Sequence, residues 1–292
     1  MYHFGDGVPK DEKRAFALFT QGCNGGDVRA CSNLGVMYAD GIVVPQDDAR
    51  ALALYTRACD AGHPMGCSNL GTLYVKGNGV VKDEARALTL YKRACDGGET
   101  LGCANLGGMY GGGIGVPKDE ARAFALSKQA CDGGQASACS NLGIMYQDGA
   151  GGPKDEARAV ALYKQSCEAG DAGGCANLAW MYRTGAGVPK DEARAAVLNK
   201  QSCDAGNATA CANLGGMVQE GVGVAKDEAR AMALYKQACD GGSASTCSHL
   251  GALYRDGAGV PKDPVRAAAL FKQACDGGDP AGCSSLRGLS GN

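Results

Sequence analysis

The chain has 292 residues, a formal net charge of -2 and 45% hydrophobic residues. A nearly neutral chain has no large basic field that would attract nucleic acid or anionic lipid, so we expect no nucleic-acid partner. No apolar run is long enough to cross a bilayer, so we expect no membrane span. Length alone would predict two domains, but the 16 cysteines recur in a regular pattern that must be interpreted first.

The chain opens with Met1 and Tyr2, in the positions that Met109 and Tyr110 occupy at the end of a helical segment further on. We therefore expect a chain truncated at its N-terminus, lacking a signal peptide and a capping helix. The other end also stops within a helical pattern, where Arg287 takes a position that is elsewhere glycine or alanine. Solenoids generally need polar capping units, so we expect the natural product to be longer.

The cysteines come in pairs eight positions apart, and each pair returns after 36 residues without insertion or deletion. A fixed period of this length is the signature of a repeat protein, whose units contact mainly their neighbours. We therefore predict one domain over residues 1–292. The pairs are Cys23/Cys31, Cys59/Cys67, Cys95/Cys103, Cys131/Cys139, Cys167/Cys175, Cys203/Cys211, Cys239/Cys247 and Cys275/Cys283.

Each unit predicts two helices. In the unit that begins at Cys95, the first helix carries apolar or small residues at the spacing of one helical face. A glycine-rich break over residues 111–118 follows, then Asp119 as a candidate N-cap of the second helix. Gly97 and Gly98 end the equivalent helix one unit earlier, since glycine favours the left-handed C-terminal position. No segment alternates like a strand, so we predict an all-α fold.

Two positions in each unit hold only small residues. A glycine inside a helix costs about 1 kcal/mol, so its recurrence indicates that a neighbouring helix approaches closely. The glycine position comprises Gly35, Gly71, Gly107, Gly143, Gly215 and Gly251, with Ala179 once. The alanine position of the second helix comprises Ala15, Ala51, Ala87, Ala123, Ala159, Ala195, Ala231 and Ala267.

The recurring pattern C-x-N-L-G-x-x-Y…G-x-G-V-x-K-D-x-x-R-A…L-Y…A-C resembles Sel1-like repeats, relatives of the tetratricopeptide repeats. The cysteine pair in every unit makes the chain similar to the Helicobacter cysteine-rich protein group within that family. The resemblance covers essentially the whole chain. It implies an α/α solenoid of about eight 36-residue repeats, stacked as antiparallel helix pairs into a right-handed superhelix with a concave inner face.

The cysteine pairs flank turns between two antiparallel helices and lie on apolar faces, which makes disulfide geometry feasible. A bridge that closes about nine residues contributes about 2–3 kcal/mol in the chain-entropy model. The alternatives are small buried hydrophobic residues or metal ligands, but His3, His63 and His249 lie in unrelated positions. We predict one disulfide per repeat, no metal, no cofactor and an oxidising compartment, as in a secreted or periplasmic protein.

One polar position of the first helix, named here the Asn slot, recurs although asparagine is a mediocre residue inside helices. By resemblance to tetratricopeptide domains, this slot faces the concave groove, where the amides hold the backbone of a bound peptide. The alternative is that each asparagine bonds to a neighbouring repeat. The slot comprises Asn33, Asn69, Asn105, Asn141, Asn177 and Asn213, followed by His249 and Ser285.

Three positions further on comes a variable slot, which by the same resemblance also lines the groove. It includes Trp180, the single tryptophan of the chain. An exposed tryptophan in a groove would be a binding hot spot, whereas burial under the adjacent loop is the structural alternative. The slot comprises Val36, Thr72, Gly108, Ile144, Trp180, Gly216 and Ala252. The polar residues Gln147, Arg183, Gln219 and Arg255 follow; they could supply ligand contacts, and we interpret them as solvated.

An arginine of the second helix and the glycine loops have simpler interpretations. Each arginine follows Lys-Asp-Glu in most repeats, which indicates a solvated ion-pair face of small energetic value. The loops lack the lysine context of a phosphate-binding loop and the acidic spacing of an EF-hand, so we interpret them as helix connectors. The arginines are Arg14, Arg50, Arg86, Arg122, Arg158, Arg194, Arg230 and Arg266.

The function expected from these observations is binding of a protein or peptide on the concave face by a monomer without catalytic residues. The resemblance leaves two alternatives open. Some cysteine-rich members of the family are described as penicillin-binding or weakly β-lactam-hydrolysing, but the chain has no S-x-x-K, S-D-N, K-T-G or G-x-S-x-G motif. The other alternative resembles the Sel1-like respiratory-assembly factor of the mitochondrial intermembrane space.

Overall fold

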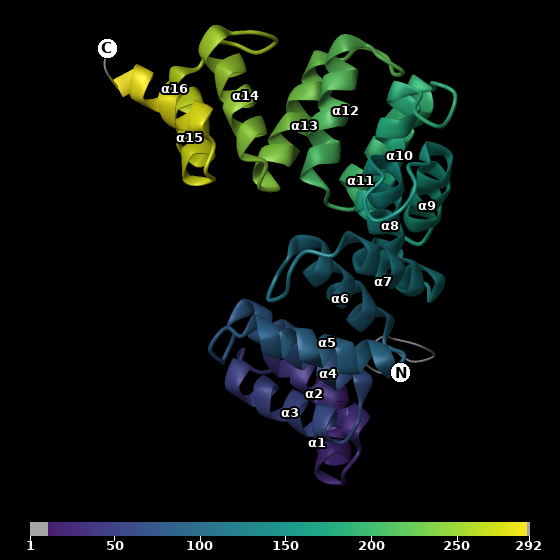
Figure 1. Ribbon diagram of the computed structural model, residues 1–292. Helices are drawn as coiled ribbons and strands as arrows, with labels where there is room; N and C mark the ends of the chain where they lie inside the picture. The colour runs from purple at the N-terminus through teal and green to yellow at the C-terminus, as the bar shows by residue number, and fades with distance from the viewer. Residues whose placement is uncertain (1–10, 291–292) are drawn as a thin grey trace. The chain divides into compact units, whose positions relative to one another are not determined.

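A computed structural model describes residues 11–290, and all its regular elements are helices, as predicted (Figure 1). Met1 and Tyr2 lie outside the described residues. The described chain divides into two compact units: residues up to Ala138 with Gly149–Pro153, and Cys139–Asp148 with the residues from Lys154 onwards. The interpretation of residues 1–292 as one domain stays a prediction.

Sixteen helices lie within residues 11–290: α1 (Glu12–Asn24), α2 (Val28–Asp40), α3 (Asp48–Asp60), α4 (Pro64–Lys76), α5 (Glu84–Asp96), α6 (Thr100–Gly112), α7 (Glu120–Asp132), α8 (Ala136–Asp148), α9 (Glu156–Glu168), α10 (Ala172–Thr184), α11 (Glu192–Asp204), α12 (Ala208–Glu220), α13 (Glu228–Asp240), α14 (Ala244–Asp256), α15 (Pro264–Asp276) and α16 (Pro280–Ser290).

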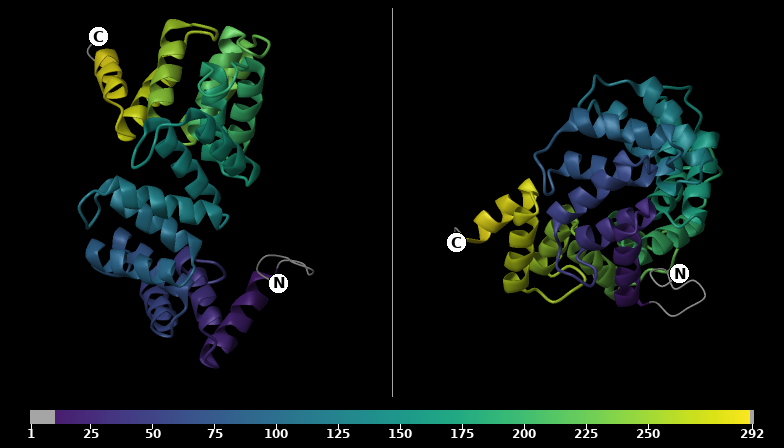
Figure 2. Two further views of the ribbon diagram at one scale, coloured as in Figure 1. Left: turned by 45° about the vertical axis from the view of Figure 1, so that its right-hand side comes forward. Right: turned by 90° about the horizontal axis from the view of Figure 1, so that it is seen from below.

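Within each unit, consecutive helices pack against each other as hairpins (Figures 1 and 2). A long loop leads from each even-numbered helix to the next odd-numbered one, and a short turn leads on to the following even-numbered helix. Packing is more extensive across the long loops than across the short turns. This order confirms the prediction that each 36-residue repeat consists of a helix, a loop, a second helix and a turn. The right-handed course of the superhelix stays a prediction.

The predicted helix ends are confirmed. Asp119 caps α7, because its Oδ1 accepts a hydrogen bond from the backbone N–H of Arg122 at 2.9 Å. Gly98, just after α5, has a φ of 87°, a left-handed conformation that favours glycine. The same bond from a backbone N–H is accepted at 2.9–3.0 Å by Asp11, Asp47, Asp83, Asp155, Asp191, Asp227 and Asp263.

The disulfides close the short turns. All 16 cysteines are disulfide-bonded, which confirms one bridge per repeat. The pair Cys203–Cys211 joins α11 to α12 with its Cα atoms 4.6 Å apart, and both side chains are buried. The Cα distance is 4.5–4.7 Å in the pairs Cys23–Cys31, Cys59–Cys67, Cys95–Cys103, Cys167–Cys175, Cys239–Cys247 and Cys275–Cys283.

The small positions do mark close approaches between helices. A Cβ on Gly143 would lie 2.6 Å from Cε1 of Tyr163, so only glycine lets the tyrosine ring of α9 pack this closely against α8. Glycine and ring meet in the same way at Gly35/Tyr55, Gly71/Tyr91, Gly215/Tyr235 and Gly251/Phe271. The alanine position of the odd-numbered helices is buried throughout: Ala15, Ala51, Ala87, Ala123, Ala159, Ala195, Ala231 and Ala267.

Candidate functional site

The Asn slot and the variable slot lie on the even-numbered helices, and the helical surface that carries both is named here the Asn-slot face. Its asparagines are half-buried or exposed, whereas the leucine and glycine that follow each of them in sequence are mostly buried. The asparagines are therefore placed where their amides can reach a ligand. They are Asn33, Asn69, Asn105, Asn141, Asn177 and Asn213.

Hydrogen bonds distinguish one asparagine from the others. Nδ2 of Asn177 donates to Oγ of Ser140 at 3.2 Å, which ties α10 to α8 within the second unit. Among residues 11–290, the amides of Asn33, Asn69, Asn105, Asn141 and Asn213 have no hydrogen-bond partner. The alternative role, a bond to the neighbouring repeat, thus applies to Asn177 alone in the described chain.

The variable slot presents apolar side chains at two successive repeats of the second unit. Ile144 on α8 is 42% exposed, and Trp180 on α10 is 41% exposed. Trp180 is therefore not buried under the adjacent loop. Because the bond between Asn177 and Ser140 holds the two helices together, the two side chains occupy equivalent places on adjacent helices. We name this pair the Ile144–Trp180 patch.

Two of the polar residues that we interpreted as solvated have partners inside the fold. The hydroxyl of Tyr163 donates to Oε1 of Gln147 at 2.8 Å, and that of Tyr235 donates to Oε1 of Gln219 at 2.7 Å. These glutamines hold the tyrosines that lie against the glycine position. The interpretation of Gln147 and Gln219 as solvated residues was therefore wrong, because the tyrosine hydroxyls need partners at the helix edge.

His249, the first replacement of asparagine in the Asn slot, also packs locally. The ring of His249 meets the ring of Tyr235 edge to face, with the centroids 4.9 Å apart. Burial lowers the pKa of His249 below its usual range, so the imidazole is neutral near pH 7. His249 therefore takes part in packing, while the asparagines of the preceding repeats present amides.

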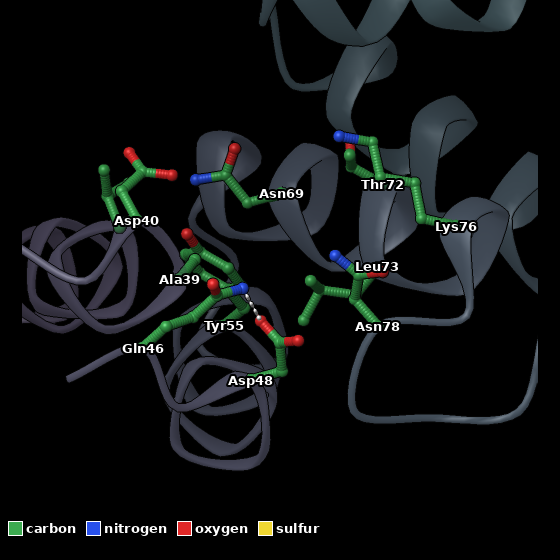
Figure 3. A pocket seen from close by; sticks show the side chains of 11 residues that line it. Ala39, Asp40, Gln46, Asp48, Tyr55, Asn69, Thr72, Leu73, Lys76 and Asn78 are labelled. Carbon is green, nitrogen blue, oxygen red and sulfur yellow. Dashed lines mark hydrogen bonds between the residues drawn. The ribbon is translucent and has the colours of Figure 1, made fainter. Parts of the chain in front are cut away.

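A pocket of about 460 Å³ opens on the Asn-slot face of the first unit. Residues of α2, α3, α4 and their loops line it (Figure 3). In that view Asp40 and Asn69 lie on one side, and Gln46 and Asp48 lie on the other, joined by a hydrogen bond of 3.1 Å. The eleven lining residues are Val36, Ala39, Asp40, Gln46, Asp48, Tyr55, Asn69, Thr72, Leu73, Lys76 and Asn78.

The pocket is lined both by residues that were predicted to face the groove and by residues that were not. Asn69 comes from the Asn slot, and Val36 and Thr72 come from the variable slot, so three expected groove residues meet here. The contributions of Asp40 and Tyr55 were missed. Their sequence signal was weak but present, because Ala39 stands in the position where Gln147 and Gln219 supply tyrosine partners in later repeats.

Burial raises the pKa of the Tyr55 hydroxyl well above its usual range, and the nearby Asp40 carboxylate raises it further. The hydroxyl therefore stays protonated at physiological pH and can donate a hydrogen bond. Within residues 11–290 no group of three or more His, Cys, Asp and Glu side chains is arranged to hold a metal ion. In the same part of the chain, no helix is both long enough and apolar enough to cross a membrane.

Comparison with known proteins agrees with the repeat pattern. The model of the Sel1 repeat matches residues 1–27, 28–63, 64–99, 100–135, 136–171, 172–207, 208–243 and 244–279. In this frame the disulfides join the last helix of one matched repeat to the first helix of the next, except Cys275–Cys283, whose second cysteine lies beyond the last matched repeat. No functionally curated protein matches the chain.

Among solved structures, the chain is similar to a protective antigen of uropathogenic Escherichia coli, with 32% identity and a TM-score of 0.67. That match covers 98% of this chain, which spans only 61% of the antigen's length. A Sel1 repeat protein from Oxalobacter formigenes shares 24% identity over 84% of this chain and 96% of its own, with a TM-score of 0.74. Cysteine-rich protein B of Helicobacter pylori shares 27% identity, covering 44% of this chain and 93% of its own, with a TM-score of 0.37.

Proposed function

The chain belongs to the Sel1 repeat family, and we propose that it is a non-catalytic scaffold that binds a protein or peptide on its Asn-slot face. Sel1 repeat proteins mediate protein interactions, which makes binding the general function of the fold. The specific proposal is that the ligand crosses successive even-numbered helices, contacting the variable slot and the free asparagine amides in register.

The observation that carries the proposal is the Ile144–Trp180 patch. Tryptophan is enriched among the residues that dominate binding energy, and such residues contribute most when a ligand covers them. Trp180 is half-exposed in the free chain, and its equivalent in the preceding repeat, Ile144, is an equally exposed isoleucine. A single exposed apolar residue would need no explanation, but two in equivalent positions offer adjacent anchors for one ligand.

The asparagines on either side of this patch add polar recognition. Asn141 is exposed and has no partner among residues 11–290, and Oδ1 of Asn177 accepts no bond from the same residues. An amide offers both a donor and an acceptor, so it can match the N–H and C=O of a peptide backbone. Apolar anchors flanked by amides are suited to a peptide rather than to a small apolar ligand.

The disulfides support two parts of the proposal: a rigid Asn-slot face and an oxidising compartment for the protein. The bridges fix each even-numbered helix to the helix before it, so the chain loses less conformational entropy when a ligand binds. They also indicate an oxidising compartment, and we propose a secreted or periplasmic monomer.

The proposal predicts a loss of affinity when the patch is truncated. A ligand captured from extract of the source organism on the immobilised chain would be titrated against Trp180→Ala and against the triple variant with Asn141→Ala and Asn177→Ala. We expect Trp180→Ala to weaken binding at least about tenfold, because a hot-spot truncation costs about 2 kcal/mol or more. Calorimetric titration of the purified ligand gives the ratio directly.

The matched control is Lys200→Ala on α11. Lys200 is exposed and pairs with Asp204, four residues later on the same odd-numbered helix, so its loss leaves the Asn-slot face unchanged. We expect this variant to bind as the unmodified chain does. Equal affinities for Trp180→Ala, the triple variant and the control would show that the ligand binds elsewhere.

A further inference from the structure

We propose that the pocket between α2 and α4 receives a lysine or arginine side chain of the bound peptide, with its cation beside Asp40 and Asp48 and an adjoining carbonyl on Tyr55. This inference rests on the proposed function and adds the chemistry of the ligand. It is carried by an unpartnered tyrosine hydroxyl, by two carboxylates that form no ion pair in the described chain, and by the cavity that all three line (Figure 3).

Tyr55 differs from its equivalents in the other repeats. The hydroxyl of Tyr91 is hydrogen-bonded to Oγ1 of Thr72 at 3.1 Å, and those of Tyr163 and Tyr235 bond to glutamines. Tyr55 has no hydrogen-bond partner among residues 11–290, although it is only 3% exposed and lines the pocket.

The sequence explains why this hydroxyl is left over. The repeat of Tyr55 has Val36 where Thr72 stands one repeat later, and Ala39 where two later repeats have Gln147 and Gln219. Both side chains that could accept its hydrogen bond are therefore replaced by apolar ones. The hydroxyl oxygen is not among the fully buried polar atoms without a partner, so it faces the open pocket. A ligand acceptor placed here would take the hydrogen bond that the fold leaves to solvent.

The charge of the pocket determines which kind of ligand side chain it favours. Asp40 and Asp48 have no ion-pair partner among residues 11–290, and Asp48 accepts one hydrogen bond, from Gln46. Lys76, the only cation among the eleven lining residues, stands at the end of α4 and forms no ion pair in the described chain. Two carboxylates against one ammonium leave the lining with a net negative charge, which favours a cationic side chain over a neutral or acidic one.

The size and position of the pocket fit a side chain together with its backbone. Its volume of about 460 Å³ falls within the range of small-ligand sites, which is more than a single side chain requires. Asn69 lines the same pocket with a free amide, so it can hold the backbone beside the cationic residue. The pocket is therefore a specificity site on the Asn-slot face of the first unit, and the Ile144–Trp180 patch belongs to the second unit.

The test uses the full oxidised chain and blocked pentapeptides Ala-Ala-X-Ala-Ala, where X is lysine, arginine, norleucine or glutamate. Nuclear magnetic resonance follows the side-chain amide of Asn69 as the reporter of the pocket and the indole N–H of Trp180 as the reporter of the patch. We expect the lysine and arginine peptides to shift the Asn69 signal with at least tenfold higher affinity than norleucine or glutamate.

Matched variants separate the contributions. Asp40→Asn is expected to lower the affinity of the lysine peptide about tenfold, and Tyr55→Phe about fivefold. Tyr235→Phe is the control, because it removes the same hydroxyl from a tyrosine whose partner is Gln219. The control should leave the affinity at the pocket unchanged. The urea midpoint of Tyr55→Phe should stay at the wild-type value, since no hydrogen bond within the described chain is lost.

The outcomes are distinct. Equal binding of norleucine and lysine at Asn69, or unchanged affinity in both Asp40→Asn and Tyr55→Phe, would overturn the proposal for the pocket. Shifts confined to the Trp180 signal would overturn it too, while leaving the Asn-slot face as a peptide-binding surface. If no peptide shifts either signal, the pocket proposal fails, and a simultaneous lack of effect of Trp180→Ala on the captured ligand would overturn the proposed function.

Discussion

Complete reduction of the disulfides is expected to remove cooperative folding at 37 °C. Each bridge closes a short loop and contributes about 2–3 kcal/mol, so eight contribute about 20 kcal/mol. The net stability of a folded protein is commonly about 5–15 kcal/mol, which is less than that total. The position of the bridges strengthens the expectation, because they join helices across the short turns, where packing is less extensive than across the long loops.

The measurement is far-ultraviolet circular dichroism during heating, made on chain that has been unfolded, reduced and returned to native buffer with reductant. We expect a weak helical signal that declines without a sharp transition, whereas the oxidised chain taken through the same steps should melt cooperatively. A matched variant, Cys203→Ala with Cys211→Ala, removes one bridge and should lower the free energy of unfolding by about 2–3 kcal/mol. Equal melting of the reduced and oxidised chains would contradict this account of stability.

A second large effect is expected where the pairing of glycine with tyrosine is replaced. At the position equivalent to Gly143 and Tyr163, the chain has Ala179 on α10 and Asn199 on α11. Both side chains are buried, and Oδ1 of Asn199 has no hydrogen-bond partner in the described chain. We expect Asn199→Tyr alone to destabilise by about 1–3 kcal/mol, because the new ring would collide with the methyl group of Ala179.

The double variant Asn199→Tyr with Ala179→Gly should recover most of this loss. Ala179→Gly alone costs about 1 kcal/mol of helix propensity, but it opens the place that the ring needs. The unsatisfied Oδ1 of Asn199 is removed at the same time. Urea unfolding of the four proteins should therefore show a favourable coupling of about 1 kcal/mol or more. Strictly additive losses would show that the two positions do not constrain each other.

The fold could be predicted largely because its determinants are local and repeat every 36 residues. Asp119 and Gly98 mark helix ends through contacts within a few residues, and the eight-residue spacing of Cys203 and Cys211 matches the turn that they close. Gly143 was also informative, since a glycine inside a helix needs a packing reason. Each of these signals recurs along the chain at the 36-residue period, which distinguishes it from a chance occurrence.

The contacts that were missed join residues across the long loop. The guanidinium of Arg50 lies 5.2 Å from the ring centroid of Tyr38 and donates to its hydroxyl at 3.2 Å, although the sequence indicated only an exposed ion pair. The predicted pair with Asp47 is present as well, at 3.1 Å. Both partners recur in most repeats, but nothing in their spacing shows that the loop brings the aromatic face under the arginine.

The pocket was harder still to foresee because it depends on differences between repeats. Asn69 was an expected groove residue, but the role of Tyr55 follows from Val36 and Ala39, which lack the polar groups of their equivalents. Such a site appears only when three helices are placed together. Sequence periodicity identifies the shared frame, and the departures from it identify where one repeat differs in function.

The most direct test of binding on the Asn-slot face is site-specific photo-cross-linking of the full oxidised chain in extract of the source organism. The photoreactive residue p-benzoylphenylalanine would replace Ile144, beside Trp180, or Lys200 on the exposed side of α11. The account predicts a discrete cross-linked partner from position 144, lost when Trp180→Ala is added, and none from position 200. A partner captured equally from both positions, or from position 200 alone, would contradict it.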